Sequence, residues 1–98
     1  MRLAKIIGQV VATVRNPQLG MDKLLLIQML GVDGKPEPQV QVAVDRLGAG
    51  NGEWVLVVSG SSARKSMEGD DNAPVDLSVV GIIDEVSTDA GINYSKKG

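Results

Sequence analysis

The chain has 98 residues, of which 43% are apolar and 22% charged, and it carries a formal net charge of −2. It contains neither histidine nor cysteine, which excludes imidazole acid–base chemistry, thiolate metal sites and disulfides. One domain is expected at this length. No run approaches the roughly 20 apolar residues that cross a bilayer, and the first residues lack a signal-peptide pattern, so we expect a soluble cytoplasmic protein.

Fourteen valines and six isoleucines gather in short runs between glycine-rich breaks, a pattern typical of β-strands. The first run, residues 3–14, is long for one strand, and Gly8 within it predicts a bend or bulge. The second run, Lys23 to Leu30, is continuously apolar and fits a buried helix equally well by its periodicity. Its shortness and the turn signal at Asp33-Gly34 favour a strand that enters a hairpin.

The rest of the chain continues the β pattern. Residues 39–45 alternate between polar and apolar, which predicts one apolar and one solvated face. A glycine-rich loop follows, then a strand at 54–58 and a last long strand at 77–86. Residues 60–67, with a serine cap, are the one plausible helix. This order of elements predicts an all-β fold, a small OB-like five-stranded barrel with one short helix.

The loop from Gly48 to Gly52 is similar to nucleotide-binding loops in composition only. A Walker loop continues with Gly-Lys-Ser/Thr into a helix, whereas Glu53 and a predicted strand follow here. A hairpin loop with a turn at Asn51-Gly52 explains the glycines better. Close approach of another subunit to the backbone is a second use for them.

No acid, base and nucleophile form a catalytic pattern in this sequence. Asp84 and Glu85 are adjacent on a predicted strand and therefore point to opposite faces. The acidic turn at residues 70–72 lacks the ligand spacing of an EF-hand, and helix capping explains the serines near Lys65. We therefore expect no enzyme, no cofactor and no metal site.

An OB-like barrel also raises the alternative of a small nucleic-acid-binding module. Such surfaces stack bases on aromatic side chains and follow phosphates with a basic groove. This chain has one tryptophan, one tyrosine and no phenylalanine, with a slight acidic excess. Its composition therefore disfavours a nucleic-acid partner.

Five segments form an ordered set of motifs, at residues 4–13, 20–27, 42–57, 60–64 and 79–84. Together they resemble the EutN/CcmL family, the vertex proteins of bacterial microcompartments. The specific part is Asp-x-x-Gly-Ala-Gly-x-Gly-Glu combined with Gly-Ser-Ser-Ala-Arg further along the chain. From this similarity we expect a vertex domain at residues 1–87 and a polar C-terminal tail at residues 88–98.

The resemblance implies a barrel that assembles as a cyclic homo-pentamer at the corners of a shell otherwise tiled by hexameric shell proteins. It implies a structural protein without catalytic activity, bound to neither nucleic acid nor membrane, in the shell of a cytoplasmic microcompartment. A carboxysome and a catabolic compartment both fit, and an axial opening that conducts small molecules fits as well as a plug. The residues expected at the subunit interface or central axis are Asp45, Gly48, Ala49, Gly50, Gly52, Glu53, Gly60, Ser61, Ser62, Ala63 and Arg64.

Overall fold

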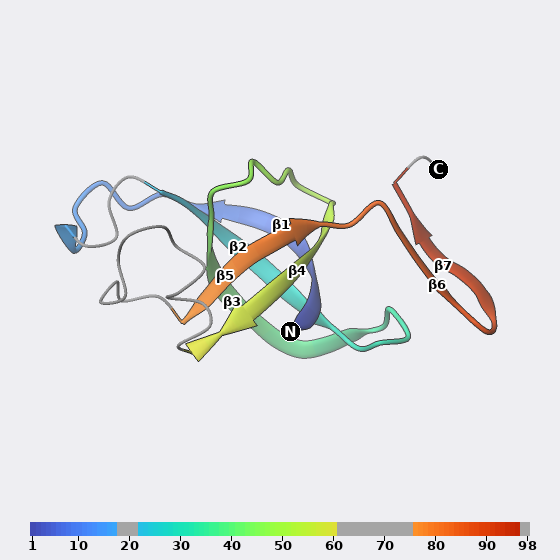
Figure 1. Cartoon of the computed structure of the whole chain (residues 1–98). Coiled ribbons are helices and arrows are strands. Elements are labelled where there is room, and N and C mark those ends of the chain that lie inside the picture. Colours follow the sequence, from blue (N-terminus) through green and yellow to red (C-terminus); the bar gives the residue numbers. More distant parts are fainter. Residues whose placement is uncertain (18–21, 61–75, 97–98) are drawn as a thin grey trace.

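The computed structural model describes residues 1–17, 22–60 and 76–96. Five strands close into a barrel in the order β1-β2-β3-β5-β4, and two further strands pair as a separate hairpin (Figure 1). The strands are β1 (Arg2–Val10), β2 (Lys23–Leu30), β3 (Pro36–Asp45), β4 (Trp54–Ser59), β5 (Leu77–Ile82), β6 (Glu85–Thr88) and β7 (Gly91–Ser95). The predicted all-β barrel is confirmed. The helix expected at 60–67 lies, apart from its first residue, outside the described residues.

The first two strands and their turns follow the sequence pattern. β1 pairs antiparallel with both β2 and β4, and its register with β2 shifts between Ile6 and Gly8, which confirms the predicted bulge. β2 pairs with β1 on one side and β3 on the other, so the helical interpretation of Lys23–Leu30 is wrong. The turn between β2 and β3 needs a glycine at Gly34, which has φ +83° and donates its N–H to the Gly31 carbonyl at 2.9 Å.

In the part of the chain that the structure describes, aliphatic side chains and the side chain of Met29 form the core of the barrel. Alternate residues of each strand point inward, as the period of two requires, and burying one such side chain contributes about 1.5–3 kcal/mol. The core residues that are at most 6% exposed and form one cluster are Ala4, Ile6, Leu25, Ile27, Met29, Ala43, Ala49, Val55, Val57, Leu77 and Val79.

β3 departs from the simple alternation expected for it. Val44 is buried, but Val40 and Val42 on the same face are 45% and 46% exposed. The apolar face expected for this strand is therefore present, but over the first half of β3 it is exposed on the outside of the barrel. The physical reason is that Val44 packs in an outer cluster with Leu24, Val10, Ala12 and Val58, and among the described residues this cluster does not include Val40 or Val42.

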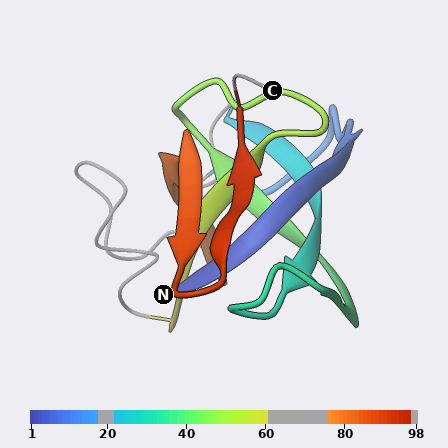
Figure 2. The ribbon, with the colours of Figure 1, turned by 90° about the vertical axis from the view of Figure 1, so that its right-hand side faces the viewer.

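The last long strand expected at residues 77–86 is two strands that belong to different sheets. β5 ends at Ile82, and the next residue is held in place because Ile83 donates its N–H to the Trp54 carbonyl at 2.9 Å. After Asp84 the chain leaves the barrel, and β6 pairs with β7. Figure 1 shows this hairpin to one side of the barrel, and in Figure 2 it lies in front of the barrel. It crosses the boundary expected at residue 87.

Candidate subunit interface

The segment that joins β3 to β4 closes one end of the barrel with the buried Ala49. The expectation of a hairpin loop here is wrong, because β5 lies between β3 and β4 in the barrel. The turn at Asn51-Gly52 is confirmed, with Gly52 at φ +88°. Gly52 donates its N–H to the Ile6 carbonyl at 2.8 Å, and the Ile6 N–H donates to the Glu53 carbonyl at 2.9 Å. These bonds fix the loop to β1.

The carboxylate of Asp45 holds the first half of this loop. The residue is 2% exposed. Its Oδ1 accepts the Leu47 N–H and its Oδ2 accepts the Ala49 N–H, both at 2.8 Å. Between these two donors Gly48 has φ +89°, a conformation that favours glycine. A buried carboxylate is tolerated only when its oxygens are bonded, so Asp45 acts as a cap that sets the shape of the loop.

Three charged side chains, Glu53, Lys96 and Lys23, hold the second half of the loop. Glu53 Oε1 accepts the Gly50 N–H at 2.6 Å, and its Oε2 lies 2.7 Å from the Lys96 Nζ. On the other side, Lys23 Nζ donates to the Ala49 carbonyl at 3.0 Å. The loop is therefore held from β2 and from the end of β7 as well as from within.

The ion pair between Glu53 and Lys96 predicts a lowered pKa for the Glu53 carboxyl. The Lys96 hydrogen bond, followed by the Gly50 N–H, lowers the pKa of Glu53 below its usual value. A lowered carboxyl pKa contributes stability above the usual value of about 4.3, and this is lost as the pH falls through the folded-state pKa. In Lys96→Met the pKa of Glu53 is expected to rise, and NMR titration of its carboxyl carbon measures this. Lys35→Met is the control, and an equal pKa in all three proteins contradicts the pairing.

The structure gathers six of the predicted interface residues into one unit, the capped loop that runs from Asp45 to Glu53. Gly60 lies apart from this loop. Glu53 directly precedes β4 and Gly60 directly follows it, so the six residues of the strand separate the two. Gly60 has φ +63° and donates its N–H to the Asp76 carbonyl at 3.1 Å. The other four predicted residues, Ser61, Ser62, Ala63 and Arg64, lie outside the described residues.

The sequence analysis missed how the C-terminal hairpin is attached. The ring of Tyr94 on β7 stacks on Trp54 at the start of β4, with centroids 4.3 Å apart and an angle of 14° between the planes. The Trp54 ring also lies against the β2–β3 turn, since a Cβ added on Gly34 would lie 2.8 Å from it. The sequence contains one tryptophan, one tyrosine and no phenylalanine, so a contact between these two rings was the signal that could have indicated the attachment.

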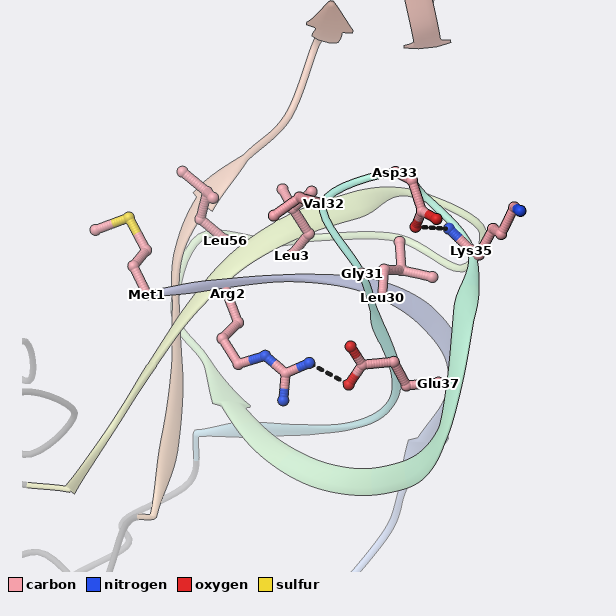
Figure 3. Close-up of a pocket in the computed structure, with 10 residues that line it drawn as sticks. All are labelled: Met1, Arg2, Leu3, Leu30, Gly31, Val32, Asp33, Lys35, Glu37 and Leu56. Carbon is pink, nitrogen blue, oxygen red and sulfur yellow. Dashed lines mark hydrogen bonds and ion pairs between the residues drawn. The ribbon is translucent and has the colours of Figure 1, made fainter. Parts of the chain in front are cut away.

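A second missed feature is a groove of about 790 Å³ between the start of β1 and the β2–β3 turn, with Leu56 of β4 also lining it. Figure 3 shows Leu3, Val32 and Leu56 standing together at its mouth, with the ion pair between Arg2 and Glu37 below them. The exposed Val32 and the half-buried Leu3 and Leu56, beside an exposed ion pair, suit packing against another protein surface better than chemistry.

The described parts of the chain contain no cluster of three or more carboxylates that is arranged to hold a metal ion. Over the same residues, no helix is long and apolar enough to cross a membrane.

Comparison with known proteins gives the class. Residues 1–84 match the family model described as ethanolamine utilisation protein EutN/carboxysome. The microcompartment shell vertex protein EutN of Escherichia coli is 49% identical, over 98% of this chain and 100% of that protein. The carboxysome shell vertex protein CcmL of Synechocystis sp. is 48% identical, over 99% and 96%. The solved structure of GrpN, a pentameric microcompartment shell protein from Rhodospirillum rubrum, has TM-score 0.80 and 45% identity over 90% of this chain and 99% of that one.

This chain belongs to the EutN/CcmL family of bacterial microcompartment shell vertex proteins. Its role is structural and not enzymatic, and its place is the microcompartment shell. The relatives support the vertex role and not the nucleic-acid alternative.

Proposed function

We propose that five copies of this chain form a cyclic pentamer that caps a vertex of the shell, with hexameric shell proteins as its neighbours. The observation that carries this proposal is the 45% identity to a shell protein described as pentameric, over nearly the full length of both chains. A flat layer of hexagonal units has no curvature, and fivefold units at its corners supply it. A ring of this kind joins two different surfaces of each subunit.

We also propose that the loop from Gly48 to Glu53 lies in the ring interface, together with the segment 60–64. A Cβ added at Gly48, Gly52 or Gly60 would meet none of the described residues within 4 Å, which supports approach to these backbones from a neighbouring subunit. The bonds from Asp45 and Glu53 fix the loop within a single subunit. Assembly would therefore cost little conformational entropy in the loop, which favours binding.

A bulky side chain at Gly50 tests this placement. Gly50 is not among the glycines with positive φ, so its backbone accepts a side chain, and a Cβ there would lie 3.2 Å from the Glu53 Oε1. Gly50→Leu is expected to convert the pentamer into monomers or aggregates, because the leucine would displace the Glu53 carboxylate and change the loop surface that faces the neighbouring subunit. Native mass spectrometry measures the distribution, with Val14→Leu at a 95% exposed site outside the strands as the control. Intact pentamers of Gly50→Leu would contradict the placement.

The capping role has its own test in co-expression with hexameric shell proteins. Shells made with this chain are expected to be closed polyhedra, and shells made without it to be open at their corners. Electron microscopy and leakage of an enclosed fluorescent protein distinguish the two. Equally well sealed shells in both preparations would contradict the capping role. The oligomeric state is measured separately and would not be affected by that result.

A further inference from the structure

The C-terminal hairpin, β6 and β7, has little support from its own barrel. The described contacts that attach it to the barrel gather at its base: the stack of Tyr94 on Trp54, the Trp54 N–H donated to the Tyr94 hydroxyl at 3.4 Å, and the ion pair of Lys96 with Glu53. Beyond this base the hairpin projects from the barrel (Figures 1 and 2). An isolated two-stranded hairpin is marginally stable in water, so this one needs a covering surface.

The exposed part of the hairpin is suited to a protein surface. Ile92 on β7 is 63% exposed, and Gly91, Asn93 and Ser87 around it are exposed and uncharged. The centres of protein interfaces are depleted of charged residues in the same way. The stacked and ion-paired base also holds the arm in one direction before any partner arrives, which lowers the entropy lost on binding.

A matching surface lies on another wall of the same barrel. Leu26 of β2 is directly opposite Val42 of β3, and Gln28 is opposite Val40, so these side chains share the outer face of the two strands. Both valines are nearly half exposed. We call this outer face of Leu26, Gln28, Val40 and Val42 the β2–β3 patch. It is apolar with one neutral amide, and a two-stranded hairpin can pack on it face to face.

We infer that the β6–β7 hairpin of one copy packs on the β2–β3 patch of the next copy in the ring, an inference that rests on the proposed pentamer. The hairpin is anchored at Trp54 on β4, and in the barrel order β5 separates β4 from β3. Donor and acceptor surfaces thus lie on different walls, as a closed ring of identical copies requires. The groove between β1 and the β2–β3 turn is the weaker acceptor, because four charged residues line it: Arg2, Asp33, Lys35 and Glu37. The anchoring residue Glu53 also ends the loop proposed for the interface, so the two contacts are continuous.

The absence of cysteine from the sequence allows a clean cross-linking test. In the double variant Ile92→Cys with Val42→Cys, a short bis-maleimide is expected to link neighbours into a ladder that ends at the covalent pentamer. Each single variant is the matched control and is expected to remain monomeric on a denaturing gel. A double variant that stays monomeric there, or that stops at dimers, would overturn the inference.

Native mass spectrometry of the unmodified chain separates this inference from the proposed function. A ring of another size with links still forming between positions 92 and 42 would overturn the pentamer and support the docking. A pentamer in which no links form between positions 92 and 42 would support the proposed function and overturn the docking of the hairpin.

A charge on the hairpin gives an independent measurement. Ile92→Asp is expected to raise the protein concentration needed for half assembly by at least tenfold, while Ile92→Val changes it less than threefold. Val14→Asp, at a 95% exposed valine outside the strands, is the control for added charge. Equal weakening by Ile92→Asp and Val14→Asp would contradict a specific contact. Circular dichroism of the monomers confirms that each variant is folded.

Discussion

Replacing Asp45 by alanine is expected to destabilise the subunit by about 3–5 kcal/mol, because hydrogen bonds to a charged group contribute about 1.5–3 kcal/mol each. The substitution leaves the Leu47 and Ala49 N–H groups without their acceptor. Ala49 is fully buried, so water cannot replace the carboxylate there without opening the barrel end. Urea unfolding followed by the fluorescence of Trp54 measures the loss.

The matched control for this substitution is Asp22→Ala. The Asp22 carboxylate pairs with Arg46 at 2.9 Å, and the guanidinium is 40% exposed, so this pair contributes at most about 1 kcal/mol. Asp45→Ala should also reduce assembly, since the loop that it caps is proposed to face the next subunit. Equal destabilisation by the two alanine variants would show that the Asp45 cap does not determine the loop.

The second large effect is expected in the core. Ile27 is fully buried in β2, between β1 and β3. Ile27→Ala removes three carbons from an aliphatic core that has no aromatic side chain to move into the space, and we expect a loss of about 2–5 kcal/mol. Ile27→Val, which removes one carbon, should cost about 0.5–1.5 kcal/mol.

Both core variants should be measured at one fixed subunit concentration, because assembly adds to the apparent stability of any oligomer. A destabilisation by Ile27→Ala no larger than that of Ile27→Val would mean that the barrel interior collapses around the missing carbons. That outcome would contradict the close packing described for this core.

Several elements could be predicted because their causes are local. Gly8 permits a bulge wherever the strand needs one, and Gly34 adopts a positive φ that its neighbours in the turn cannot. The β-branched runs specify extended chain before any partner strand is present. The spacing of Asp45, the glycines and Glu53 indicated the family for a similar reason, since a capped loop needs these residue types at fixed separations.

Other features depend on which strands become neighbours. The hairpin interpretation of the Gly48–Gly52 loop failed because consecutive strands usually pair, and here β5 returns to lie between β3 and β4. The C-terminal hairpin was described only as a polar tail, because the stabilising partner of Tyr94 is Trp54, forty residues earlier in the sequence. The contact that holds the hairpin on the barrel joins residues far apart in the chain, so no short stretch of sequence reveals it.

By itself, the sequence determined that this chain is a cysteine-free β protein with the motifs of a shell vertex family. Only the tertiary structure decided that Asp45 is a buried cap, that Val40 and Val42 face outward, and that the last strands leave the barrel. The physical reason is that the alternation of residues along a strand assigns them to its two faces but does not determine which face becomes buried. Closure of the barrel makes that choice, through pairings between residues far apart in the chain.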